Sequence, residues 1–353
     1  MAYRRIPVEF LIFAAGFATI FGAVALTNFV VDPFQYFRAA DHPRFSNLMQ
    51  RHQVPGVVRN YAFDSIVVGS STMANLSPVR FKAASIPDVL NLSFWGGTAN
   101  EASRVIRLSL REKHLKTVYW AIDPALITND FRYPDFPFCM YDRLLSLLPY
   151  CYLFSRDIFV ESIATFLPDI TIGRAGWVGD IEAWKSVSAA PFSHREFGCE
   201  IKRRLGNTRQ LDAALLGEMK TRFLDLVVNL VEAHPQTSFR IVFPPMYAPE
   251  LWLRSHDQPE NLPFIDWAQR ILVKLPNVSI FDFQLADLTT DETRFRDALH
   301  TYPEVSDEMA RWLVSDKFRL LPGDMDRAST ARKESAMEGE QLAAHYQCSQ
   351  GLK

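Results

Sequence analysis

The sequence has almost no net charge, and this limits the partners that the protein can bind. Its 353 residues include 38 lysines and arginines against 40 aspartates and glutamates, which gives a formal charge of −2. Domains that bind nucleic acid usually carry a marked excess of basic residues. The composition excludes a polycationic surface of that kind, and we expect no nucleic acid among the partners.

Cysteine is scarce as well, with four residues in the chain: Cys139, Cys151, Cys199 and Cys348. They show no C-x-x-C spacing and no accompanying histidine pattern, which argues against a zinc site. No metal or organic cofactor is implied. In an oxidising compartment Cys139 and Cys151 could form a disulfide, and two buried free thiols are the alternative.

One stretch, residues 10–31, lacks charge altogether and is long enough to cross a bilayer, since a spanning helix needs about 20 apolar residues. Arg4 and Arg5 precede it, and Asp32 is the first charged residue after it. The positive-inside rule therefore predicts a cytoplasmic N-terminus at residues 1–9. The remainder is then expected outside the cytoplasm, on the periplasmic face of the inner membrane.

A cleaved signal peptide is the alternative for this stretch, because Ala23-Val24-Ala25 offers a small-residue cleavage pattern. The apolar run continues past this point to Val31, which favours a retained anchor. Both interpretations export the rest of the chain.

Two further segments lack a periodic apolar pattern. Residues 32–61 are rich in proline, arginine, histidine and aromatics, and we expect a membrane-proximal linker there. Residues 323–353 have almost no large apolar side chains and are mixed in charge, which predicts a disordered tail.

Between them, residues 62–322 alternate apolar, β-rich runs with segments of helical period. Such alternation predicts an α/β domain whose mostly parallel sheet is covered by helices on both faces, with its site at the carboxyl ends of the strands. An insertion at 131–210 is expected to cap that site, and a packing subdomain unrelated to substrate is the alternative. The expected strands are 64–69, 88–94, 117–122, 238–243 and 278–283, and the expected helices are 78–85, 100–114, 211–233, 264–275 and 303–318.

The first expected strand ends in Gly69-Ser70-Ser71-Thr72. A tight strand-to-helix turn exposes a serine hydroxyl and points backbone N–H groups toward a developing oxyanion. We favour Ser71 as the nucleophile, whereas the plainer interpretation is that Ser and Thr simply cap the following turn.

Asp297 and His300 lie three residues apart after the last expected strand. This spacing lets a carboxylate reach Nδ1 of an imidazole whose Nε2 faces the serine. A D-x-x-H pair alone is more often a surface ion pair, so its placement relative to Ser71 is what favours a Ser-His-Asp triad.

With these two blocks the chain resembles the SGNH/GDSL hydrolase superfamily, and more narrowly its membrane-anchored, exported members of polysaccharide O-acylation, including the alginate acetylation group. The resemblance implies a flavodoxin-like SGNH fold, with Ser71 as nucleophile, His300 as base and Asp297 as its orienting acid. It also implies an oxyanion hole formed by the N–H groups of Ser71 and of Gly97 or Gly96.

The resemblance fails at the third block, where Asp123 stands in place of the family's asparagine. An ionised carboxylate cannot donate a hydrogen bond. Asn100 and Asn129 are the nearest amides that could complete the hole, although Asn100 would equally serve as a helix N-cap.

These observations predict an exported serine O-acyl esterase or acyltransferase. The expected partners are a cell-surface polysaccharide or acyl-ester substrate, the membrane, and a membrane-bound acyltransferase. The alternative is a catalytically silent SGNH-like module that binds glycan or organises a membrane acylation or export complex. A lipid-directed thioesterase or lipase is less favoured, because no long apolar loop follows the anchor.

Overall fold

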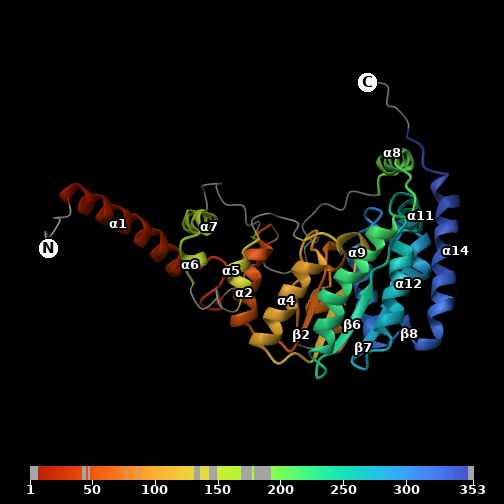
Figure 1. Cartoon of the computed structure of the whole chain (residues 1–353), viewed down its shortest axis with the longest axis horizontal. Coiled ribbons are helices and arrows are strands. Elements are labelled where there is room, and N and C mark those ends of the chain that lie inside the picture. Colours follow the sequence, from red (N-terminus) through yellow and green to blue (C-terminus); the bar gives the residue numbers. More distant parts are fainter. Residues whose placement is uncertain are drawn as a thin grey trace. The chain divides into compact units, whose positions relative to one another are not determined.

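The computed structural model describes residues 7–41, 45–46, 48–76, 78–86, 88–130, 136–142, 149–167, 177–178 and 192–348. The chain forms two compact units, which can be followed by colour in Figure 1. The first contains residues 1–61 and 135–180, and the second contains residues 62–134 and 181–353.

The first unit begins with helix α1 (Val8–Val31), whose only charged residue is Glu9. The helix is long and apolar enough to cross a membrane, and its apolar side chains are exposed. Asn28 attaches the last turns of α1 to the rest of this unit. Its side chain is fully buried and donates hydrogen bonds to the carbonyls of Leu153 and Ser155.

The rest of this unit corrects the expected linker, because residues 50–60 form a buried helix. The sequence pattern did not predict this helix, because it contains Pro55 and Gly56, and both residue types are unfavourable in helix interiors. Gly56 is required there by packing: a Cβ on it would lie 2.5 Å from the Gln35 carbonyl oxygen. The elements of this unit are α2 (Gln50–Asn60), α5 (Phe138–Tyr141), α6 (Tyr150–Leu153), α7 (Arg156–Phe166) and the antiparallel pair β1 (Phe45–Ser46) and β5 (Trp177–Val178).

All four cysteines are paired. Cys139 bonds to Cys151 in the first unit, as one of the two sequence interpretations expected. In the second unit Cys199 bonds to Cys348, a pairing that the sequence analysis missed because 149 residues separate the two.

The second unit contains the six-stranded sheet, whose order is β3-β2-β4-β6-β7-β8. All neighbouring pairs are parallel except β7 and β8, so the predicted mostly parallel sheet is confirmed, and the short antiparallel edge strand is an addition. The strands are β2 (Ser65–Val68), β3 (Val89–Asn91), β4 (Thr117–Ala121), β6 (Ser238–Phe243), β7 (Val278–Asp282) and β8 (Arg319–Leu320).

Helices cover this sheet, also as predicted. Val67, Tyr119 and Phe281 share one face with Phe81 of α3 and Met309 of α13 in a single buried cluster. On the opposite face α4, α9 and α12 lie side by side (Figure 1). The helices are α3 (Pro78–Ala83), α4 (Ala99–Glu112), α9 (Ala213–Phe223) continued by α10 (Asn229–Glu232), α11 (Ala248–Asp257), α12 (Asn261–Leu272) and α13 (Pro303–Val314).

The expected disordered tail is wrong for most of its length, because helix α14 (Met325–Ala343) packs along α11. Small residues make this close packing possible, and Gly339 touches the backbone of Ala248. Arg332 is 1% exposed and forms ion pairs with Asp282 and Asp266. A helix held by small residues and one buried cation carries no strong apolar period in its sequence.

The expected insertion at 131–210 is not one piece. Residues 135–180 belong to the first unit, whereas helix α8 (His194–Leu205) belongs to the second. The parts of this insertion at 131–135, 143–148, 168–176 and 179–191 lie outside the described residues.

Candidate active site

The turn after β2 places Ser71 at the carboxyl edge of the sheet. Gly69 ends the strand against Ala121 of the neighbouring β4, where an added Cβ would lie 2.8 Å from the Ala121 Cβ. Ser71 then opens the short 3₁₀ turn η1 (Ser71–Met73). The close approach of two parallel strands therefore explains the glycine that precedes the two serines.

Ser71, His300 and Asp297 form a chain of hydrogen bonds across 229 residues of sequence. The Oγ of Ser71 lies 2.7 Å from Nε2 of His300, and Nδ1 of His300 lies 2.8 Å from both carboxylate oxygens of Asp297. The structure thus brings together the three side chains that the sequence analysis singled out. In this arrangement the imidazole can take the serine proton while the carboxylate holds its tautomer.

A tight loop fixes the acid and the imidazole relative to each other. Its ends are joined by a β-bridge between Phe295 and Thr301, and the Arg296 N–H donates to the His300 carbonyl at 2.8 Å. Within the loop, Oδ1 of Asp297 accepts the backbone N–H groups of Leu299 and His300, each at 2.9 Å. The D-x-x-H spacing is therefore a turn closed by its own aspartate.

These contacts determine the charge state of Asp297. Partial burial acts to raise the pKa of its carboxyl, but the hydrogen bond and charge of His300 and the two backbone N–H donors outweigh that effect. The pKa is lowered from its ordinary value, and the carboxylate is ionised at neutral pH. The His300 side chain is 19% exposed, so a substrate can reach it from solvent.

Asn91, at the end of β3, is a positioning residue that the sequence analysis did not identify. Its buried side-chain amide donates to the carbonyls of Met73 and Leu76, at 2.7 and 3.0 Å, and its Oδ1 accepts the Ser93 N–H at 2.9 Å. It therefore ties the segment that follows Ser71 to the neighbouring strand. Its place at a strand end was the only sequence signal.

One glycine of the second block does not take the expected place in the oxyanion hole. The Gly97 N–H donates to the Phe94 carbonyl at 3.0 Å, closing a turn in which Gly96 takes a φ of 59°. Gly97 instead supports the nucleophile turn by close packing, since a Cβ on it would lie 2.7 Å from the Gly69 carbonyl oxygen. The predicted role of Gly97 as an oxyanion donor is inconsistent with this geometry, because its N–H is already used.

The two candidate amides also have partners of their own. Asn100 lies in the first turn of α4 and its side chain hydrogen-bonds to Asp130, whereas the N-cap of that helix is Thr98. Asn129 is exposed and donates to the Ala125 carbonyl at 3.5 Å. Neither amide is seen to hydrogen-bond to Ser71 in the described part of the chain.

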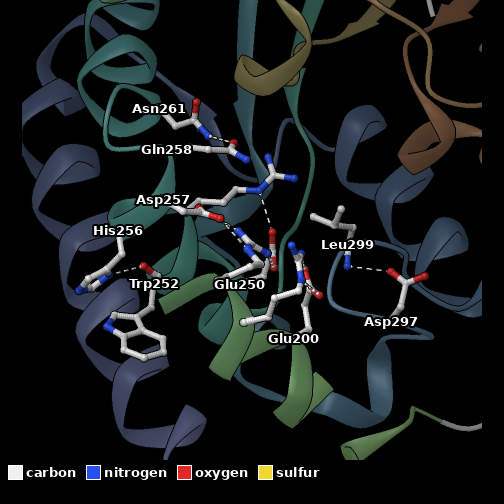
Figure 2. A network of polar contacts seen from close by, with 12 residues as sticks. Glu200, Glu250, Trp252, His256, Asp257, Gln258, Asn261, Asp297 and Leu299 are labelled. Atoms are coloured by element: carbon white, nitrogen blue, oxygen red, sulfur yellow. Dashed lines mark hydrogen bonds and ion pairs between the residues drawn. The ribbon is translucent and has the colours of Figure 1, made fainter. Parts of the chain in front are cut away.

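Asp123, the departure at the third block, belongs to a buried network of charges. Its Oδ1 accepts from the Ala125 N–H and from Arg254, both at 3.1 Å. Arg254 in turn reaches Glu250 at 2.8 Å, and Arg204 of α8 bridges Glu250 and Asp257. Figure 2 draws the Glu250 and Asp257 part of this network near Asp297 and Leu299. The carboxylate at position 123 is therefore compensated by a buried arginine.

A small cavity of about 10 Å³ lies at the carboxyl ends of β4 and β6, about the volume that one water molecule needs. Thr72 and Leu299, the sequence neighbours of the serine and the imidazole, both line it. Among the described residues, no group of three or more histidine, cysteine, aspartate or glutamate side chains is placed to hold a metal ion.

No protein-family model and no curated protein matches the chain. Among solved structures, one from Streptococcus pneumonia, whose description provisionally assigns it as a platelet activating factor, has a TM-score of 0.41 and 9% sequence identity, covering 77% of this chain and 92% of that chain. A similarity this low carries no argument, so the interpretation of the site rests on its own geometry.

Proposed function

We propose that the protein is an exported, membrane-anchored serine O-acyl esterase or acyltransferase that acts on a cell-surface polysaccharide. The observation that carries the proposed chemistry is the 2.7 Å contact between the Ser71 Oγ and the His300 Nε2, with Asp297 on the far nitrogen. The polysaccharide rests on the resemblance of the motif layout to exported acylation proteins.

In this mechanism the Ser71 Oγ attacks the acyl carbon while His300 takes the hydroxyl proton. The negative charge moves to the carbonyl oxygen, where the Ser71 N–H can meet it, since the first N–H groups of a helical turn have no acceptor within the turn. His300 then protonates the departing alcohol oxygen. Water or a sugar hydroxyl, deprotonated by His300, finally attacks the acyl-serine ester and regenerates the free hydroxyl.

The proposed location combines three observations. Helix α1 can cross a membrane, Arg4 and Arg5 precede it, and both cysteine pairs are bonded. Disulfides persist in oxidising compartments outside the cytoplasm, and the positive-inside rule places the N-terminus within it. We therefore place the second unit on the periplasmic face.

A second candidate function has its own support. The Gly97 N–H, one of the two backbone donors considered beside that of Ser71, is already bonded, and position 123 holds a carboxylate in place of an oxyanion-hole amide. Losing one such donor typically costs 10²- to 10³-fold in rate. The alternative is a catalytically silent module that binds glycan or organises a membrane acylation complex.

The test is covalent trapping of the full chain with a fluorophosphonate, followed by peptide mapping and by p-nitrophenyl acetate hydrolysis. The enzyme hypothesis expects label on Ser71, and loss of both label and hydrolysis in Ser71→Ala. Ser70→Ala is the matched control, because the Ser70 hydroxyl contacts Thr72 rather than His300, and it should retain both. Absence of label together with equal hydrolysis by the wild type and Ser71→Ala would instead favour the silent module.

A further inference from the structure

A cavity of about 740 Å³ opens between helix α8 and the loop that carries Asp297. This volume falls within the range of about 300–1,000 Å³ that is usual for ligand sites. Asp297 and Leu299 form part of one wall, and His300 follows Leu299 directly in the chain. The cavity therefore adjoins the loop that positions the candidate base.

The opposite wall presents groups suited to a sugar. Glu196 and Glu200 lie four residues apart and so share one face of α8, where their carboxylates can accept hydrogen bonds from hydroxyl groups. Phe192 and Phe197 also line the cavity, with ring centroids 5.3 Å apart. Aromatic rings of this kind offer an apolar surface for the C–H face of a sugar ring.

The charge of the cavity is negative. Four carboxylates line it against two guanidinium groups, those of Arg204 and Arg296, which leaves a formal charge of −2. The negative charge of Glu250 is compensated, because Arg204 and the buried Arg254 both contact its carboxylate, at 2.6 and 2.8 Å. Glu196 is exposed, whereas the carboxylate of Glu200, drawn in Figure 2, is balanced by an ion pair with Arg203 of the same helix.

We propose that this cavity is the acceptor subsite for a glycan without carboxylates, and that Glu196 discriminates against uronate polymers. The proposal rests on the proposed function and names its substrate class. A sugar carboxylate held about 6 Å from the Glu196 carboxylate loses about threefold in binding constant even at the dielectric constant of water, whereas the charge of Glu200 is balanced by Arg203. A neutral glycan loses no binding affinity to this repulsion, and a positively charged glucosamine polymer gains affinity.

The test is calorimetric titration of the full-length Ser71→Ala protein in detergent with β-1,4-linked hexamers of glucosamine, glucose and mannuronate. We expect binding to weaken in that order, with the mannuronate hexamer about threefold weaker than the glucose hexamer at low salt. Adding Glu196→Gln should remove most of that difference. The matched control is Glu338→Gln, an exposed glutamate on α14, which should leave the order and the difference unchanged.

The proposal is overturned if the mannuronate hexamer binds as tightly as the glucose hexamer, if Glu196→Gln does not alter the difference, or if none of the three hexamers binds. Hydrolysis of p-nitrophenyl acetate by the protein with Ser71 intact separates this result from the proposed function, because that ester is too small to need the cavity. Hydrolysis of the ester without glycan selectivity would contradict the proposed subsite but not the proposed enzymatic function. Glycan selectivity without ester hydrolysis would support the subsite and contradict the enzymatic function.

Discussion

The side chain of Asn91 holds the carbonyl of Met73 at 2.7 Å, linking the end of β3 to the turn that begins with Ser71. The same amide reaches the Leu76 carbonyl at 3.0 Å, so one buried side chain satisfies two acceptors of the nucleophile segment. The position of Ser71 therefore depends on a residue of the neighbouring strand as well as on its own turn.

Replacing Asn91 by alanine should lower the free energy of unfolding by about 2–3 kcal/mol, because buried carbonyls lose their partner. The acyl-ester kcat/KM should fall by about 10²-fold as Ser71 shifts. Asn277→Ala is the control, since Asn277 also donates to backbone carbonyls, those of Val231 in α10 and of His234 and Thr237 between α10 and β6. It should lose stability with kcat/KM within about twofold of wild type, and an equal loss of activity in both variants would contradict a positioning role for Asn91.

Gly97→Ala tests the packing of the second block. The new Cβ would meet the Gly69 carbonyl oxygen at 2.7 Å, and forcing extra volume into a packed site typically costs 1–3 kcal/mol. Gly217→Ala in α9 is the opposite case, because no atom lies within 4 Å of the added Cβ. Thermal denaturation should show Gly97→Ala destabilised and Gly217→Ala stabilised by about 0.5–1 kcal/mol. A neutral Gly97→Ala would mean that this turn is looser than the structure shows.

Asp297 predicts a specific pH dependence of stability. Because its pKa is lowered in the folded state, its contribution is present above the unfolded value of about 4 and is lost as pH falls through the folded pKa. Urea denaturation of the wild type and Asp297→Asn should therefore differ by a constant amount between pH 5 and 7, and the difference should shrink below about pH 4. A difference that grows on acidification would reverse the sign assigned here.

Asp297→Asn should also lower kcat about 10³- to 10⁴-fold, because an asparagine cannot hold the His300 imidazole in the required tautomer. The loss should be uniform between pH 5 and 9, since the carboxylate that it replaces is ionised throughout that range. Pre-steady-state measurement of p-nitrophenol release checks this. A variant that regains full activity at high pH would show that Asp297 acts on the ionisation of His300 rather than on its tautomer.

The sequence predicted the core strands well, because each is a short β-branched or aromatic run bounded by turn residues. Ser238–Phe243 was predicted to the residue, and the serine, imidazole and carboxylate were found because their order along an α/β chain fixes the strand edge at which they meet. The features that the sequence did not predict share a physical cause. Helix α2 and the α8 disulfide are held by close backbone contact and by a long-range bond, which leave no local periodicity.

The assignment of the Gly97 N–H to the oxyanion hole failed for a related reason. A glycine pair in the right place predicts a turn, but which N–H closes that turn depends on the ψ of each residue, and a sequence pattern does not contain that information. The bonding of Gly97 to Phe94 and of Asp123 to Arg254 became visible only with the fold. The partner of Asp123 lies on α11, a helix that the sequence analysis did not predict.

Arg332 offers the sharpest test of the C-terminal helix. Its side chain is 1% exposed and pairs with Asp282, whose side chain is fully buried, so Arg332→Leu leaves a carboxylate without its cation. Breaking such a pair costs about 3–5 kcal/mol, whereas removing both charges is far less costly. Chemical denaturation should therefore show a large loss for Arg332→Leu and partial recovery when Asp282→Asn is added.

Arg270→Leu is the matched control, because Arg270 pairs with Asp326 in a contact that is 48% and 91% exposed, and exposed pairs contribute about 1 kcal/mol at most. Limited proteolysis supplies a second measurement: Arg332→Leu should expose residues 325–343 to cleavage before the rest of the second unit, and Arg270→Leu should not. If the two variants lose equally little stability and the wild-type segment is cleaved at once, α14 does not pack in solution, and the disordered tail expected from composition would be the better description.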